Sequence, residues 1–195
     1  MSDKPTIIVL CGKSASGKDT LLKWLSIRLL KNGIECKKII SDTTRPPRIG
    51  EQDGEDYNFI NTTEFLNRKD NAYYIEFSEF NNWYYGTPLN QLSKNKINIG
   101  IFNVDGIKSL YNYIDSYNIY IVYLECGLFE RIKRSVKREH KISFEMIRRI
   151  FADEKDFMNF REYLSLFKYK TILSSPLITI NAKIIESYIR DKHLI

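Results

Sequence analysis

Short runs of apolar residues alternate along this chain with longer segments in which leucines and isoleucines recur every three or four positions. The runs at residues 6–10, 97–104 and 119–124 are rich in β-branched side chains, as buried parallel strands are. Residues 19–31 place their leucines at helical spacing, and Asn32-Gly33 ends that helix. This alternation predicts an α/β fold with a central parallel sheet and helices on both faces.

The interval at residues 41–95 departs from the alternation. It contains a Pro-Pro turn, three short aromatic segments of strand composition, and a helix that begins at Asn61, where Glu64 completes a capping box. Thr87-Pro88 predicts the start of a further helix. We interpret the interval as a lobe inserted into the α/β core.

The last third of the chain is largely helical in pattern. Residues 127–139 predict a basic helix, and Ser143 predicts the N-cap of a long one. We expect the apolar residues of that long helix to form one buried face. They are Ile147, Ile150, Phe151, Phe157 and Leu164.

A glycine-rich segment, Gly-Lys-Ser-Ala-Ser-Gly-Lys, occupies positions 12–18 between the first strand and the first helix. It fits the pattern Gly-x-x-x-x-Gly-Lys in the strand–loop–helix context of a phosphate-binding loop. Glycines let backbone N–H groups converge on phosphates, and the helix N-terminus adds positive potential. We expect Lys18 to reach the β- and γ-phosphates of a nucleoside triphosphate.

The residue after this lysine is an unusual one. Serine or threonine commonly stands there and ligates Mg²⁺, whereas this chain has Asp19 followed by Thr20. The Asp19 carboxylate could hold Mg²⁺ directly or through water, or Thr20 could have taken over the hydroxyl role. Both residues are therefore candidate metal ligands.

A second candidate anion site follows about thirty positions later. Arg45 and Arg48 flank Pro46-Pro47. Because prolines fix the turn, both guanidinium groups can be aimed at one phosphate at little ordering cost. Two anion sites on one small chain suggest a phosphoryl donor and a phosphoryl acceptor held face to face.

The residues around this turn resemble the signature of guanylate kinases. The resemblance rests on Thr-Thr-Arg-Pro-Pro-Arg at 43–48, on the Gly, Glu, Asp and Tyr positions at 50–57, and on Ile-Glu-Phe at 75–77 followed by Tyr-Tyr-Gly-Thr at 84–87. It implies a single domain covering residues 1–195. That domain has a core of residues 1–40, 96–125 and 151–195, a monophosphate-binding lobe at 41–95, and a lid at 126–150.

The resemblance also implies roles for individual residues. The donor ATP would be bound by Gly12, Lys13, Ser14, Ala15, Ser16, Gly17, Lys18, Asp19, Thr20 and Arg131. GMP would be bound by Ser41, Arg45, Arg48, Tyr57, Glu76, Tyr85, Thr87 and Asp105. Charge on the transferring phosphoryl group would be stabilised by Lys18, Arg45, Arg134 and Arg149. Glu76 suits guanine, because a carboxylate accepts from N1–H and N2–H together and adenine has no such pair of donors.

Three departures from the family pattern stand out. The first acidic residue of the Asp-Ile-Asp stretch is Asn103 here, while Asp105 keeps the second. The Asn-Asp pair that contacts adenine is replaced by Ser174-Ser175. Asp19 makes the phosphate loop similar to that of ribose bisphosphate kinases, which share the fold.

The resemblance implies transfer of the γ-phosphoryl group of ATP, with Mg²⁺, to GMP or dGMP. Two alternatives stay open: a related small-molecule kinase, acting on ribose bisphosphate or on a broader range of nucleotides, and a non-catalytic guanylate-kinase-like module that binds proteins. Intact Gly12, Gly17 and Lys18 favour catalysis over the module.

Composition and charge limit the partners and the location that we expect for this protein. The net charge is +6, but basic residues are spread along the chain, so no nucleic-acid partner is expected. No apolar run approaches the roughly 18 residues that span a bilayer, and the N-terminus lacks a signal-peptide layout, so we expect a cytoplasmic protein. Cys11, Cys36 and Cys126 have no metal-like spacing, and we expect free, buried thiols.

Overall fold

The structure is a computed structural model that describes residues 4–48, 50–80, 82–140, 142–174 and 178–191. Its centre is a five-stranded sheet in the order β2-β7-β1-β8-β9, with every neighbouring pair parallel. The strands are β1 (Thr6–Cys11), β2 (Cys36–Lys38), β7 (Ile97–Ile101), β8 (Asn118–Glu125) and β9 (Lys168–Leu173). The predicted α/β fold with a parallel sheet is confirmed.

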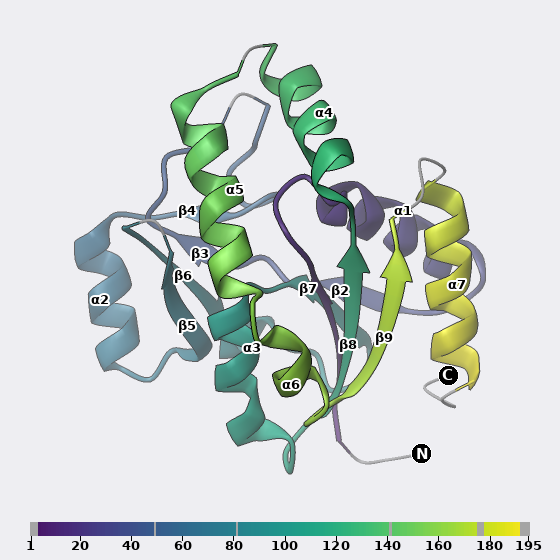
Figure 1. The fold of residues 1–195 in the computed structure, drawn as a ribbon. Coiled ribbons are helices and arrows are strands. Elements are labelled where there is room, and N and C mark those ends of the chain that lie inside the picture. The colour runs from purple at the N-terminus through teal and green to yellow at the C-terminus, as the bar shows by residue number, and fades with distance from the viewer. Residues whose placement is uncertain (1–3, 49, 81, 141, 175–177, 192–195) are drawn as a thin grey trace.

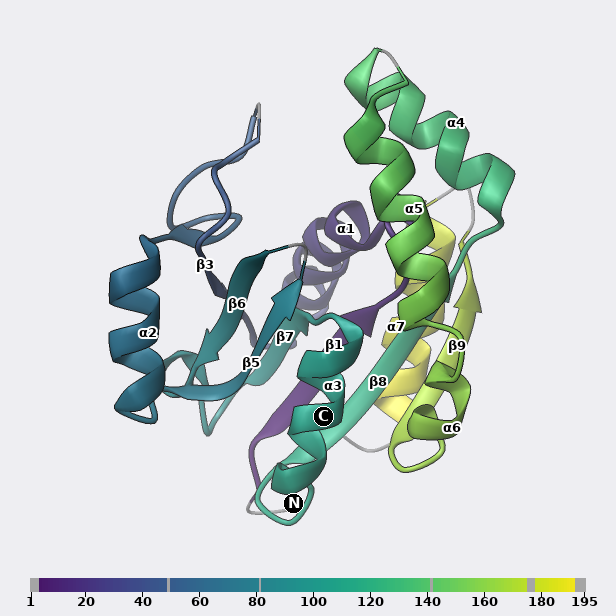
Figure 2. The same cartoon turned by 60° about the vertical axis from the view of Figure 1, so that its left-hand side comes forward.

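Helices cover both faces of this sheet, as Figures 1 and 2 show. Side chains alternate along β1, so Ile7 and Val9 face one core while Ile8 and Leu10 face the other. The first core is closed by α3 (Val104–Leu110) and α6 (Phe160–Leu164), and the second by α1 (Lys18–Lys31) and α7 (Ile178–Asp191). Each fully buried leucine or isoleucine contributes roughly 1.5–3 kcal/mol to the stability of the fold. This packing holds the strands in place, and with them the strand ends where the site lies.

A second sheet is built from residues between Asp42 and Pro88, within the interval interpreted as an insertion. Its order is β4-β3-β6-β5, with α2 (Thr62–Asp70) beside it. The strands are β3 (Asp42–Thr43), β4 (Asn58–Phe59), β5 (Tyr74–Phe80) and β6 (Trp83–Pro88). Asn61 caps α2 as predicted, accepting a bond from the Glu64 backbone N–H at 2.8 Å, while the Glu64 carboxylate pairs with Arg68 in place of the reciprocal bond of the expected capping box.

One expectation in this region is wrong. Thr87-Pro88 does not begin a helix, because both residues end strand β6, and the short 3₁₀ turn Leu89–Gln91 follows them. Thr87 pairs with Glu76 of β5 across the antiparallel ladder. This pairing, rather than a cap, determines where the Thr87 side chain points.

Two helices, α4 (Leu128–Glu139) and α5 (Phe144–Asp156), stand above the carboxyl ends of the large sheet (Figure 1). Ser143 caps α5 as predicted, accepting from the Met146 N–H at 3.0 Å. The predicted long helix is interrupted after Asp156. The expected buried apolar face is correct only beyond this break, where Phe157 packs against the core and Leu164 of α6 is buried. Met146, Arg149 and Asp153 face inward, whereas Phe144, Ile147 and Phe151 are exposed.

Two further predictions concern membranes and thiols. Among the described residues, no helix combines the length and apolarity needed to cross a bilayer. All three cysteines are free, as expected, but only Cys11 is buried. The expectation that Cys36 and Cys126 are buried is wrong, because both are half-buried.

Candidate active site

The phosphate loop lies between β1 and α1. Gly12 is packed so closely against β8 that a Cβ atom would lie 2.5 Å from the Leu124 carbonyl oxygen. Lys18 donates from Nζ to the Gly12 and Lys13 carbonyl oxygens at 2.7 and 3.1 Å. Burial lowers the pKa of Lys18, while the nearby carboxylates of Asp19 and Asp153 raise it. The lysine is thus folded over its own loop, at the place where a phosphate chain would be bound.

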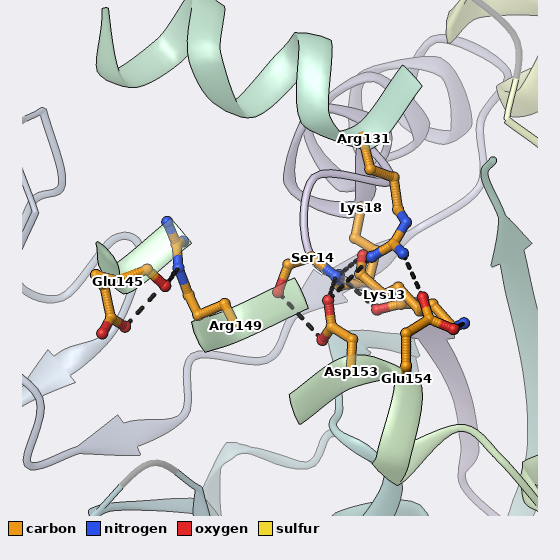
Figure 3. A network of polar contacts seen from close by, with 9 residues as sticks. Lys13, Ser14, Lys18, Arg131, Glu145, Arg149, Asp153 and Glu154 are labelled. Atoms are coloured by element: carbon orange, nitrogen blue, oxygen red, sulfur yellow. Dashed lines mark hydrogen bonds and ion pairs between the residues drawn. The ribbon is translucent and has the colours of Figure 1, made fainter. Parts of the chain in front are cut away.

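Two carboxylates of α5 contact this loop, and Figure 3 shows the network. Asp153 accepts from the Ser14 backbone N–H at 2.7 Å and from Ser14 Oγ at 3.2 Å. Glu154 pairs with Lys13 at 2.5 Å. Arg131 of α4 joins both acids, at 3.1 Å from Asp153 and 2.6 Å from Glu154. Neither acid was predicted from the sequence, although Asp153 lies one helical turn from Arg149, which was predicted as a site residue.

The other lid arginines are placed differently. Arg134 donates to the Ser16 carbonyl oxygen at 3.0 Å and to Ser174 Oγ at 2.8 Å, so it lies against the phosphate loop. Arg149 donates to the Glu145 carbonyl oxygen at 3.4 Å and points away from the Arg131 cluster (Figure 3). Of the pair substituting for the family's adenine contact, Ser174 lies beside the loop, and Ser175 lies outside the described residues.

Arg45 and Arg48 converge on one carboxylate. Arg45 is buried and lies 2.9 Å from Glu51, with its guanidinium over the Tyr57 ring at 5.4 Å. Arg48 is more exposed and binds Glu51 through its backbone N–H at 2.7 Å. Burial, followed by the positive charges of Arg45 and Arg149, lowers the pKa of the Arg48 guanidinium. These cations are therefore concentrated near one point, where an anion would be attracted.

Glu76 stands at the other end of the acceptor region. It is 6% exposed and accepts a hydrogen bond from Thr87 Oγ1 at 2.6 Å, and Thr87 Oγ1 lies 3.1 Å from Ser41 Oγ. Burial raises the pKa of Glu76 from 4.5 to about 7, against the lowering effect of the Thr87 bonds. A Cβ atom at Gly106 would lie 2.5 Å from Glu76 Oε2, so the start of α3 holds this carboxylate in place.

A cavity of about 160 Å³ connects the phosphate loop with Glu76. Tyr57, Tyr85 and Ser41 also line it, as expected of acceptor-binding residues. Asn103 lines it too, while Asp105 does not and pairs instead with Lys108 at 3.0 Å on the surface. The expectation that Asp105 faces the acceptor therefore disagrees with the geometry. Asn103 takes that place, donating to Ser78 Oγ at 2.7 Å and capping α3 at Gly106 N–H.

The candidate metal ligands Asp19 and Thr20 are both exposed at the start of α1. Asp19 raises the pKa of the Tyr57 hydroxyl, an effect second to burial, and it lines a small cavity with Tyr57 and Ser41. Within the described part of the chain, no three or more His, Cys, Asp or Glu residues are grouped to hold a metal ion. Mg²⁺ commonly takes one or two carboxylates plus phosphates and water, so the Asp19 carboxylate fits a nucleotide-bound ion.

Comparisons with known proteins agree with this arrangement. A family model described as "Guanylate kinase" matches residues 4–188. The chain is 44% identical over 84 residues to a guanylate kinase of Lawsonia intracellularis, covering 43% of this chain and 38% of that protein. It is 30% identical over 156 residues to a guanylate kinase of Prochlorococcus marinus strain MIT 9312, covering 76% and 82%.

A solved structure shares the fold. The crystal structure of guanylate kinase from Anaplasma phagocytophilum superposes with a TM-score of 0.70 at 20% identity, covering 98% of this chain and 88% of that one. The first sequence relatives are matched over only part of their length, 38% of the Lawsonia protein and 52% of one from Prochlorococcus marinus strain SARG.

Proposed function

This chain belongs to the guanylate kinase family, and from that membership and the site geometry we propose that it transfers the γ-phosphoryl group of ATP to GMP or dGMP. The observation that carries the proposal is the single cavity lined by both Lys18 and Glu76. One end of that cavity offers a phosphate loop and the other a buried carboxylate suited to a base. Two nucleotides bound at these ends would present their phosphates to each other.

The donor end would bind and polarise the triphosphate. Loop amides and Lys18 would hold its β- and γ-phosphates, once Lys18 leaves the carbonyl oxygens of its own loop. Arg134 already lies against the loop, and Arg131 pairs with Asp153, which itself binds Ser14 of the loop. Both arginines would neutralise charge on the transferring group. Mg²⁺ held near Asp19 would supply further charge neutralisation at the phosphates.

The acceptor end would orient the monophosphate. The Arg45 guanidinium lies 2.9 Å and the Arg48 guanidinium 3.9 Å from the Glu51 carboxylate in this structure, which supports their binding a phosphate between them. Tyr57 and Tyr85 line the same cavity and can donate hydrogen bonds to it. An oxygen of the acceptor phosphate would then attack the γ-phosphorus, forming a new P–O bond as the bond to ADP breaks.

The guanine base would be recognised by Glu76 and, we infer, by Asn103 in place of Asp105. Glu76 would accept from guanine N1–H and N2–H, and adenine would leave the buried carboxylate unpaired. Sites that hydrogen-bond a substrate in this way can reject analogues by roughly 10⁴-fold. Asn103 can donate through its amide, because its oxygen caps α3. Unlike an aspartate, Asn103 would contact the base without adding a second negative charge to that of Glu76.

An ADP-release assay with a panel of acceptors tests the proposal. GMP and dGMP should turn over much faster than AMP, dTMP and ribose bisphosphate, and Lys18→Ala should be inactive under the same conditions. Faster turnover of ribose bisphosphate would favour the related small-molecule kinase, to which Asp19 also points. Absence of ATP binding at millimolar MgATP would favour a non-catalytic module.

A further inference from the structure

The inward face of α5 brings an acid to the phosphate loop that the proposed reaction does not use. Asp153 is 5% exposed, and its carboxylate oxygens accept from the Ser14 backbone N–H and hydroxyl. It also pairs with Arg131 of α4, which is 1% exposed. A loop amide, a loop hydroxyl and a buried guanidinium therefore converge on one carboxylate.

These partners are the kinds of group that bind phosphate. Loop N–H groups and arginines are common phosphate donors in nucleotide sites, and a carboxylate is the anion in the chain that most resembles a phosphate oxygen pair. The Arg131 Nε atom is buried with no hydrogen-bond partner among the described residues. The guanidinium therefore retains a donor that the two α5 acids leave unused.

We propose that Asp153 is a positioning residue that occupies part of the phosphate site in the nucleotide-free protein and is displaced when ATP binds. The inference rests on the proposed function, because it takes residues 12–18 as the ATP site. Asp153 and a triphosphate are both negatively charged, and both require the Ser14 N–H and Arg131. Binding of one therefore disfavours binding of the other.

Displacement would also act on the rest of the lid. Asp153 and Arg149 lie four residues apart and share the inward face of α5. Glu154 adds bonds to Lys13 and Arg131 from the neighbouring position. When ATP takes over Ser14 and Arg131, α5 loses the bonds of Asp153 to the loop and is left with the partly exposed Glu154–Lys13 pair, so it can move with Arg149. ATP affinity would thus be set partly by the free energy of releasing this helix.

The test compares ATP binding by calorimetry in the wild type, Asp153→Asn and Asp153→Ala, with and without Mg²⁺. Asparagine keeps the size of the side chain and removes its charge, and alanine removes the acceptor as well. Glu162→Gln is the control, since Glu162 is an exposed acid on neighbouring α6 and its loss changes net charge equally. Thermal unfolding of each protein, with and without ATP, verifies folding.

We expect both Asp153 variants to bind ATP about tenfold more tightly than the wild type, because a hydrogen-bonded charge no longer competes. Their unfolding temperatures should fall without nucleotide and rise more on adding ATP, while GMP affinity and the control stay unchanged. Equal or weaker ATP binding by folded variants would overturn the inference alone. A greater Mg²⁺ requirement would also overturn it, by making Asp153 a metal ligand. Failure of the wild type to bind ATP would overturn the proposed function too.

Discussion

Neutralising Glu76 should stabilise the protein while impairing its recognition of GMP. The carboxyl group is 6% exposed, and burial raises its pKa from 4.5 to about 7. Each pKa unit corresponds to about 1.4 kcal/mol, so keeping this group ionised in the folded state costs about 3 kcal/mol. Glu76→Gln removes that cost and keeps an oxygen that can accept from Thr87.

The pH dependence has a definite sign. A carboxyl whose pKa is raised on folding loses its proton in the unfolded chain first, so it destabilises the folded protein as pH rises from about 4.5 to about 7. The free energy of unfolding of Glu76→Gln should therefore exceed that of the wild type by an amount that grows by about 2–3 kcal/mol between pH 5 and pH 8. Urea unfolding at several pH values measures this difference.

The control for this experiment is Glu79→Gln. Glu79 lies on the same strand, β5, with an exposed side chain, so its variant should run parallel to the wild type across the pH range. In steady-state assays, Glu76→Gln should lower kcat/KM for GMP by about 100-fold or more, because an amide cannot accept from both guanine donors. A stability difference that is flat with pH would refute the argument that Glu76 is buried in its charged form.

Four other substitutions test the site. Lys18→Ala should lower kcat by about 100-fold or more while GMP affinity measured by calorimetry stays within a few-fold; equal loss of both would show misfolding or a wrong assignment. Gly106→Ala should raise the KM for GMP and destabilise by roughly 1–3 kcal/mol, because its Cβ would lie 2.5 Å from Glu76 Oε2; unchanged kinetics would mean that Glu76 is not held from α3. Asn103→Ala should raise the KM for GMP, whereas Asp105→Ala should not, and the reverse order in the same assay would restore Asp105 as the acceptor contact.

Local determinants made part of this structure predictable. The phosphate loop was recognisable because its strand, glycines, lysine and helix are contiguous, and the hydrogen bonds from Lys18 stay within six residues. The caps at Asn61 and Ser143 were predictable for the same reason, since each bond spans three residues. The continuous apolar run of β1 was enough to indicate a sheet covered on both faces.

Features that depend on residues far apart in the chain could not be predicted from local sequence patterns. Asp153 binds Ser14 across 139 residues, and no local signal marks that pairing. Family motifs could not tell which of Asn103 and Asp105 faces the cavity, because the outcome depends on which of them caps α3. The apolar periodicity of α5 was real, but the inward side of that helix meets a polar loop and an arginine, so the apolar stripe faces outward.

Helix α5 turns charged side chains inward and large apolar side chains outward, and this arrangement has a thermodynamic consequence. Its inward side presents the charged Arg149 and Asp153 and one buried apolar residue, Met146, whereas its large apolar side chains Phe144, Ile147 and Phe151 are already in contact with water. Detaching such a helix uncovers little hydrocarbon, so the step should carry only a small heat-capacity change. Calorimetric titrations at different temperatures measure the heat-capacity change of nucleotide binding. That change should come chiefly from the surface that the nucleotide itself buries, and very little of it from the moving helix.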